Sequence, residues 1–146
     1  QKMVTIINEI IKYLQEYSFD VNIPAENIVE AYSVDNPDYT NPYITVEEIT
    51  NLPQMETYTD KEEYSIIGYQ IEVYTTQQEV KDEILSARDT CKYIINEITE
   101  AVVNKFGLIR NASPTILPAS EDASIQRGIL RVEAVIDKTH KYLYRR

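Results

Sequence analysis

Two hydrophobic patterns follow each other in the middle of the chain. Between Tyr64 and Thr75 apolar and polar residues alternate, which predicts a strand with Ile67, Tyr69, Ile71 and Val73 on one side and Gln70 and Glu72 on the other. From Val80 to about Lys105 apolar residues, Ile84 and Cys91 among them, recur every third or fourth position, which predicts a long helix. Gly107 stands where a left-handed helix terminator belongs. The strand is therefore expected to run directly into the helix.

Hydrophobic periodicity and turn residues predict further elements on both sides of this segment. Lys2 to Tyr17 has one apolar face and predicts a first helix, which Pro24 prevents from continuing. Strands are predicted from Ile28 to Val34, from Tyr43 to Thr50 with a bulge or strand end at Glu47–Glu48, and from Ile125 to Asp137. The polar segments from Asp35 to Pro42 and from Asn51 to Glu63 are expected to be loops.

The last predicted strand also has two distinct faces. Gly128, Leu130, Val132, Ala134 and Ile136 share one face, whereas Arg127, Arg131 and Glu133 lie on the other. The predicted order is therefore α-β-β-β-α-β-β in a single domain, residues 1–146. The fold class is α+β, a mostly antiparallel sheet with two helices packed on one face. The second face of the sheet is polar, so we expect it to meet water or another subunit.

Charge narrows the classes of function. The chain has 146 residues and a net charge of −10, which argues against sequence-independent binding of DNA or RNA through clustered Lys and Arg. The negative charge is compatible with an acidic surface that lies beside DNA and repels its phosphates. Glu9, Lys12 and Glu16 interrupt the apolar N-terminal run, so we expect an amphipathic helix and no membrane partner. Cys91 is the single cysteine, which excludes an internal disulfide.

Motifs that carry catalysis or bind cofactors are scarce. The three glycines are too far apart for a phosphate-binding loop or a dinucleotide fingerprint. A lone His140 supports neither a zinc site of the usual kind nor a catalytic triad, and Cys91 on the apolar face of the predicted helix is interpreted as a buried thiol. Asp35 to Asn41 lacks the spacing and central glycine of a calcium loop. We therefore expect no catalytic residue, no metal site and no cofactor.

Acidic pairs leave one enzymatic alternative open. A glycosidase needs two carboxylates across a cleft, and the chain offers pairs such as Glu47 with Glu48 and Glu62 with Glu63. With 24 acidic residues among 146, adjacent pairs follow from composition alone, so a solvated face is the simpler interpretation.

Tyrosine is the most biased residue type, with 12 Tyr against two Phe and no Trp. Tyrosine combines a large apolar area with a polar tip, which suits surfaces that are wet before assembly and dry afterwards. Burial in the core is the alternative for any single tyrosine. The interface candidates are Tyr39, Tyr43, Tyr58, Arg127, Arg131, Arg145 and Arg146. For Arg127 and Arg131 the alternative is pairing within the chain with Glu72 or Glu133.

The segments NPYITVEEITN, GYQIEVYT, ARDTCKYIINEITEAVVNKFGLIR and the terminal YRR resemble the tail terminator (tail-completion) proteins of tailed bacteriophages. The similarity covers most of the chain from about Ile23 onward. Tail terminators are small acidic proteins that form a six-fold ring on the head-proximal end of the tail tube. The phage-derived particles called tailocins need the same part. The motifs are loose, because the family has no catalytic function.

The resemblance implies a structural role without enzymatic activity. The expected partners are further copies of the chain in a ring, a hexamer in the family, together with the tail tube protein and the head connector or stopper protein. DNA is expected to pass through without specific binding, along a lumen where Glu47, Glu48, Glu62 and Glu63 are the candidate acidic residues. The expected location is the tail of a virion or tailocin, assembled in the cytoplasm of the bacterial host. A head-tail connector component (stopper or adaptor) and an acid-pair hydrolase stay as alternatives.

Overall fold

The computed structural model describes residues 6–31, 37–53, 64–110, 113–137 and 142–143. The helical elements are α1 (Ile6–Glu16), η1 (Ala25–Asn27), α2 (Ala87–Ile98), the π-helical turn η2 (Thr99–Val103) and α3 (Asn104–Phe106). The strands are β1 (Ile28–Glu30), β2 (Tyr43–Pro53), β3 (Tyr64–Thr75), β4 (Gln78–Val80), β5 (Glu83–Leu85), β6 (Ile109–Arg110), β7 (Thr115–Pro118), β8 (Gln126–Asp137) and β9 (Tyr142–Leu143).

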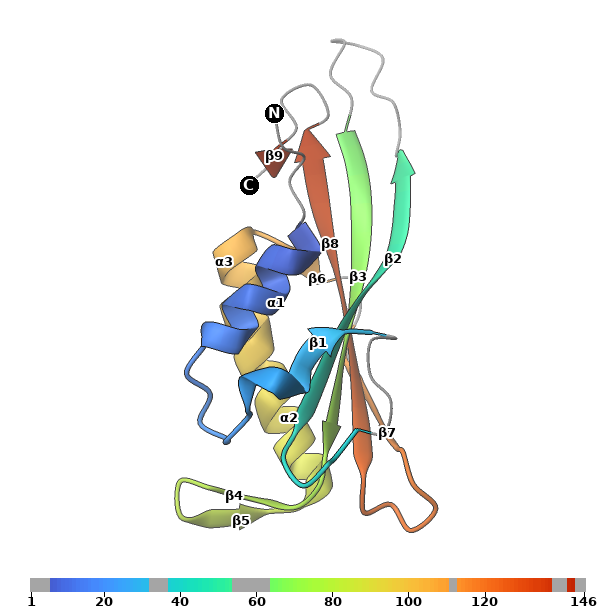
Figure 1. Cartoon of the computed structure of the whole chain (residues 1–146). Helices are drawn as coiled ribbons and strands as arrows, with labels where there is room; N and C mark the ends of the chain where they lie inside the picture. Colours follow the sequence, from blue (N-terminus) through green and yellow to red (C-terminus); the bar gives the residue numbers. More distant parts are fainter. Residues whose placement is uncertain (1–5, 32–36, 54–63, 111–112, 138–141, 144–146) are drawn as a thin grey trace.

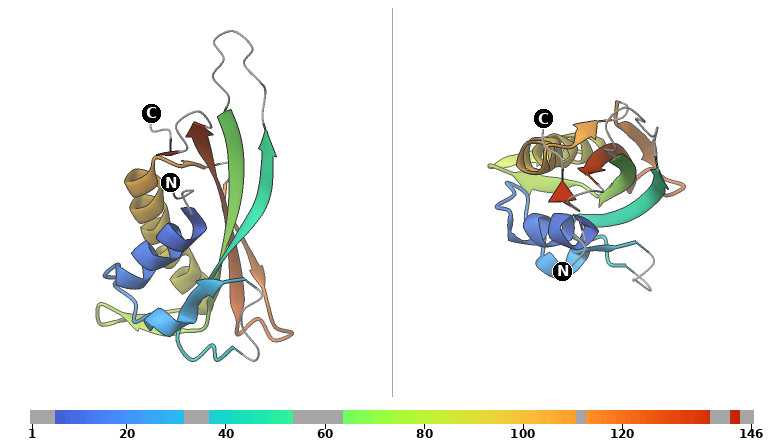
Figure 2. Two further views of the ribbon diagram at one scale, coloured as in Figure 1. Left: turned by 45° about the horizontal axis from the view of Figure 1, so that its top comes forward. Right: turned by 90° about the horizontal axis from the view of Figure 1, so that it is seen from above.

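A mostly antiparallel sheet forms one layer of the molecule, and both long helices lie on one of its faces (Figures 1 and 2). The strand order is β1-β2-β3-β8-β6, with β7 and β9 also paired to β8 and with β1 parallel to β2. Strands β4 and β5 form a separate hairpin. This confirms the predicted α+β class. We call the face that carries the helices the helix face and the opposite one the open face.

Alternation along β3 and β8 builds the core between sheet and helices. The buried strand residues are Ile44, Val46, Tyr69, Ile71, Val73, Leu130, Val132 and Ala134, and the helices add Ile10, Leu14, Cys91, Ile94, Ile95 and Ile98. Gly128 is required at the closest approach of β8 to α2, because a Cβ atom there would overlap with Ile95 and Cys91. The predicted faces of both strands and the buried position of Cys91 are confirmed.

The expectation that the strand runs directly into the helix is wrong. Residues 78–85 form the β4–β5 hairpin, and α2 begins only at Ala87, after the N-cap Ser86. The hairpin turns at Lys81 and Asp82, whose φ angles of 50° and 66° lie in the left-handed region. Within the hairpin, the side chain of Val80 is buried. The side chain of Ile84 is 70% exposed and does not belong to the apolar face of the helix.

Smaller differences concern the ends of elements. Strand β2 continues through Pro53 and pairs with β3, with a register shift between Glu48 and Thr50 that confirms the predicted bulge. Strand β1 ends at Glu30, and β6 and β7 are short additional strands beside β8. The long helix continues through η2 to Phe106 and ends at Gly107, which has the expected left-handed conformation with φ 64°.

Candidate functional site

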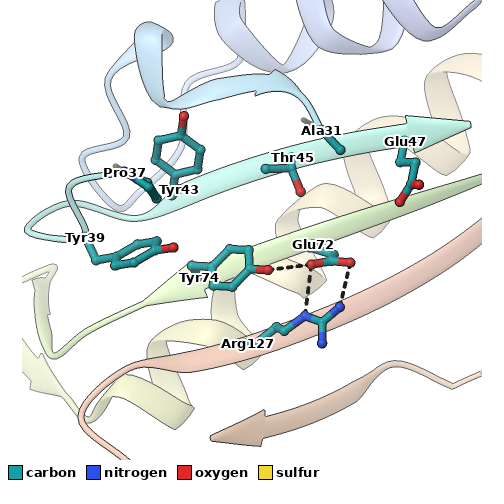
Figure 3. Close-up of a pocket in the computed structure, with 9 residues that line it drawn as sticks. All are labelled: Ala31, Pro37, Tyr39, Tyr43, Thr45, Glu47, Glu72, Tyr74 and Arg127. Atoms are coloured by element: carbon teal, nitrogen blue, oxygen red, sulfur yellow. Dashed lines mark hydrogen bonds and ion pairs between the residues drawn. The ribbon is translucent and has the colours of Figure 1, made fainter. Parts of the chain in front are cut away.

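The open face carries a shallow pocket of about 400 Å³ at the end of the sheet where β2 begins and β3 ends (Figure 3). We call it the tyrosine pocket. Its lining residues are Ala31, Pro37, Tyr39, Tyr43, Thr45, Glu47, Glu72, Tyr74 and Arg127. Alternation places Thr45, Glu72 and Tyr74 opposite the core residues of the same strands, so this surface follows directly from the pattern that builds the core.

Glu72 is the centre of a hydrogen-bond network in this pocket. Arg127 donates from Nε to Oε1 at 2.9 Å and from Nη2 to Oε2 at 2.8 Å, and Tyr74 donates its hydroxyl to Oε1 at 2.6 Å (Figure 3). The side-chain amide of Gln70 also donates to Oε2. In the register of the sheet Tyr74 lies opposite Arg127, so the pair between Glu72 and Arg127 is a diagonal one.

This network fixes the protonation states in the pocket. Burial alone would raise the pKa of Glu72, but the hydrogen bonds from Arg127, Tyr74 and Gln70 together lower it below its ordinary value. Burial and the bond to Glu72 raise the pKa of Tyr74 to about 12. Glu72 is therefore a carboxylate and Tyr74 a neutral phenol at neutral pH. Neither group is suited to proton transfer near pH 7, because both pKa values move away from it.

Three tyrosine rings make up one side of the pocket. The ring of Tyr39 stacks on that of Tyr74 at a centroid distance of 5.4 Å and meets that of Tyr43 edge-on at 6.2 Å. Tyr43 is itself buried, at 5% exposure, so its ring belongs to the wall rather than to the accessible surface. Tyr39 and Tyr74 are half-buried and present ring area to the outside.

The loop before β2 holds Tyr39 in place through its own hydrogen bonds. The Asp38 carboxylate accepts from the backbone N of Thr40 at 2.9 Å and from its Oγ1 at 2.7 Å. The carbonyl of Tyr39 accepts from Thr76 Oγ1 at 3.0 Å, and that of Thr40 accepts from Gln78 Nε2 at 2.8 Å. The pocket loop is thus attached to the first residue of β4.

Arg127 and Arg131 both lie on the open face, as predicted, but they differ in their contacts. The alternative of pairing within the chain is confirmed for Arg127, which binds Glu72. Arg131 donates from Nε to Gln70 Oε1 at 2.9 Å, and its side chain is exposed. Their role as contacts to a neighbouring molecule stays a prediction.

Of the other candidates, the described residues include Glu47 and Glu48, and the fold separates these two. Glu47 pairs with Gln70 and Glu48 with Tyr69, which places these two carboxylates on opposite faces of the sheet. Glu47 lines the tyrosine pocket, whereas exposed Glu48 lies on the helix face. Tyr58, Glu62, Glu63, Arg145 and Arg146 lie outside the described residues.

A second polar cluster connects the helix face to the β4–β5 hairpin, and the sequence pattern did not indicate it. Asp20 accepts from the hydroxyl of Tyr93 at 2.5 Å and pairs with Lys81 Nζ at 3.1 Å, and its backbone N donates to Glu97 Oε2 at 3.0 Å. The other carboxylate oxygen of Glu97 is buried and has no hydrogen-bond partner among the described residues, and burial raises the pKa of Glu97. The residues come from three distant segments, so only the fold brings them together.

Within the part of the chain that the structure describes, Cys91 belongs to neither cluster. Cys91 is fully buried, and burial raises the pKa of its thiol to about 11. His140 lies outside the described residues. Within the described ranges no three His, Cys, Asp or Glu side chains are arranged to hold a metal ion, and no helix there is long and apolar enough to cross a membrane.

A scan against models of known protein families found no match, and a search of curated protein sequences found none either.

Proposed function

We propose that this chain is a structural tail terminator of a phage or a phage-like particle. It would form a ring, six-fold in the family that it resembles, on the head-proximal end of the tail tube, stop tube polymerisation and join the tube to the head connector. The observation that carries the proposal is the two-sided architecture: helices cover one face of the sheet, and the other presents tyrosine rings and arginines.

A closed ring needs two different contact surfaces on each subunit, because every subunit meets one neighbour on each side. The open face, with ring area from Tyr39 and Tyr74 and the exposed guanidinium of Arg131, is suited to be one of them. Tyrosine and arginine are the residue types enriched at interfaces, and they are half-buried or exposed here in the single chain. The resemblance in sequence to tail terminators further supports a ring.

Charge supports passage of DNA rather than binding. A chain with a net charge of −10 in a ring around DNA repels the phosphate backbone and leaves transit free of strong attachment points. We expect carboxylates to outnumber Lys and Arg on the lumen wall. Because Glu47 and Glu48 lie on opposite faces, at most one of them can belong to a wall formed by a single face of the sheet.

The test is the length of tail tubes. The tube protein encoded with this chain should be polymerised in vitro with the chain, and in parallel with an unrelated acidic protein of similar size, and lengths should be counted in micrographs. We expect shorter tubes that carry this chain at one end. Tubes of unchanged length without the chain at their ends would contradict the proposal. Binding to an isolated connector ring instead would favour the stopper or adaptor alternative.

A further inference from the structure

The β4–β5 hairpin presents an apolar side chain to solvent. Its two faces differ: Val80 lies on the buried face, whereas Ile84 and its cross-strand partner Glu79 lie on the outward face. Ile84 is 70% exposed, well above the 38% of Ile49 and the 37% of Leu117 among the described large hydrophobic residues. A single exposed isoleucine is common on protein surfaces and does not by itself indicate a contact.

Contacts at both ends hold the hairpin in a fixed position. At the tip, Lys81 pairs with Asp20, while Val80 packs into the core at 3% exposure. At the base, Gln78 donates to the carbonyl of Thr40, next to Tyr39 of the tyrosine pocket. The hairpin therefore presents Ile84 and Glu79 outward with little loss of conformational entropy on binding, which favours a contact surface.

A complementary surface lies at the same end of the sheet on its other face. The hairpin projects on the side of the helices, whereas the tyrosine pocket opens on the open face (Figures 1 and 3). The pocket offers the stacked rings of Tyr39 and Tyr74 to an apolar side chain. Arg131 is exposed on the same face, outside the pocket lining and four residues along β8 from Arg127, and its guanidinium can pair with a carboxylate.

We propose that the β4–β5 hairpin of one copy of this chain docks on the open face of the next copy, with Ile84 in the tyrosine pocket and Glu79 paired with Arg131. This inference rests on the proposed ring and names the contact that closes it. The two surfaces lie on opposite faces, so the contact is heterologous, as a ring requires. The hairpin and the tyrosine pocket lie at the same end of the strands, so a rotation axis along the strands brings these two to the same height. Arg131 lies further along β8, opposite Gln70, so the side chain of Glu79 must extend along the open face to reach it.

We assign a second copy of this chain as the occupant of the tyrosine pocket, because the hairpin supplies both an apolar side chain for the pocket and a carboxylate for Arg131. Ile84 supplies an apolar group for a pocket of about 400 Å³ with tyrosine walls, and Glu79 supplies a carboxylate for an ion pair with Arg131. Arg127 is unsuited to this role because its guanidinium already binds Glu72 within the chain. Transfer of an exposed isoleucine into a tyrosine-lined pocket is favourable through the apolar area that it removes from water.

The experiment measures the mass of the purified chain by light scattering over a range of concentrations. We expect a ring for the wild type, and dissociation constants about tenfold or more higher for Ile84→Glu, Glu79→Arg and Arg131→Glu. The double variant Glu79→Arg with Arg131→Glu should regain the ring, because each interface then has the pair in reverse. Glu83→Arg, on the other face of the hairpin, and Arg110→Glu, on the helix face, are the matched controls and should leave assembly unchanged.

Circular dichroism of each variant separates loss of the ring from loss of the fold. A ring whose mass is unchanged by Ile84→Glu and by both charge reversals overturns the contact and leaves the proposed function intact. A double reversal that stays dissociated while both single variants are folded overturns the pairing of Glu79 with Arg131. A wild-type chain that is monomeric at its highest soluble concentration overturns the hairpin contact, and tube capping is then decided by the tube lengths alone.

Discussion

Arg127 holds the carboxylate of Glu72 in a two-point pair across the open face, with both donor–acceptor distances below 3.0 Å. The side chain of Glu72 is only 12% exposed and that of Arg127 34%. At this degree of burial, removing one partner leaves the other poorly solvated, which costs more than the pair itself contributes. The pair therefore stabilises the position of β8 against β3 and the floor of the tyrosine pocket.

We expect Glu72→Gln to lower the free energy of unfolding by about 1–3 kcal/mol at pH 7. The pKa of Glu72 is lowered in the folded chain, so its contribution is complete above the ordinary value of 4.5 and is lost as the pH falls below it. The difference between wild type and variant should therefore shrink below about pH 4.5. Urea unfolding of the monomer between pH 3 and 7, with the exposed Glu121→Gln as control, measures it. A difference independent of pH would contradict the assignment.

Glu97 should show the opposite dependence on pH. Burial raises its pKa, and within the described ranges Oε1 has no hydrogen-bond partner, so ionisation of Glu97 costs free energy in the folded chain. That cost is absent below the ordinary value of 4.5 and appears as the pH rises through the raised pKa. We expect Glu97→Gln to raise the free energy of unfolding by about 1 kcal/mol at pH 7 and by almost nothing at pH 4. The same urea series measures it, and a destabilised variant at pH 7 would be the contrary result.

The contact between α2 and β8 can be tested by a double-mutant cycle. Ile95→Ala should cost about 2–5 kcal/mol, because it leaves a cavity at the centre of the core. Gly128→Ala should cost about 1–3 kcal/mol, because the new Cβ overlaps with Ile95 and Cys91. In the double variant the smaller side chain at position 95 relieves the overlap with Ile95 but leaves that with Cys91. The loss of stability should therefore be smaller than the sum of the two single losses. Strict additivity in urea unfolding would show that the residues do not touch.

Much of the fold follows from the sequence pattern, because alternation in β3 and β8 separates core from open face residue by residue. The hairpin at Val80 and Ile84 did not follow, since two apolar residues four positions apart fit a helix as well as two strands. Its turn residues, Lys81 and Asp82, lack the Asn-Gly signal typical of such a turn. The apolar spacing therefore predicts a helix that starts about two turns too early, at Val80 instead of Ala87.

The tyrosine pocket was predicted only in parts. The sequence placed Glu72, Arg127 and Arg131 on the polar face, but the face of a residue does not give the register between strands, and the register decides which carboxylate Arg127 reaches. Tyr74 was not among the candidates, because nothing local relates it to Tyr39. Their stacking depends on where the loop before β2 lies, which hydrogen bonds to Thr76 and Gln78 fix.

The start of α2 gives a direct test of the corrected helix boundary. Ser86 accepts a hydrogen bond at Oγ from the backbone N of Asp89 at 3.1 Å, as an N-cap does. We expect Ser86→Ala to lower the free energy of unfolding by about 1 kcal/mol. Ser18→Ala, at an exposed position outside the helices, is the control and should change it by less than about 0.5 kcal/mol. An unchanged stability for Ser86→Ala would place the helix start elsewhere.

Cys91 should be protected from thiol reagents as long as the chain is folded. Its side chain is fully buried and its pKa is raised to about 11, so the reactive thiolate is both rare and inaccessible. We expect an aromatic disulfide reagent at about pH 8 to react on the order of a few hundredfold more slowly with the native chain than with the urea-unfolded one. A Lys92→Cys variant in a Cys91→Ser background, with its thiol on the exposed side of α2, is the matched control and should react rapidly when folded. Equal rates for native and unfolded Cys91 would contradict its place in the core.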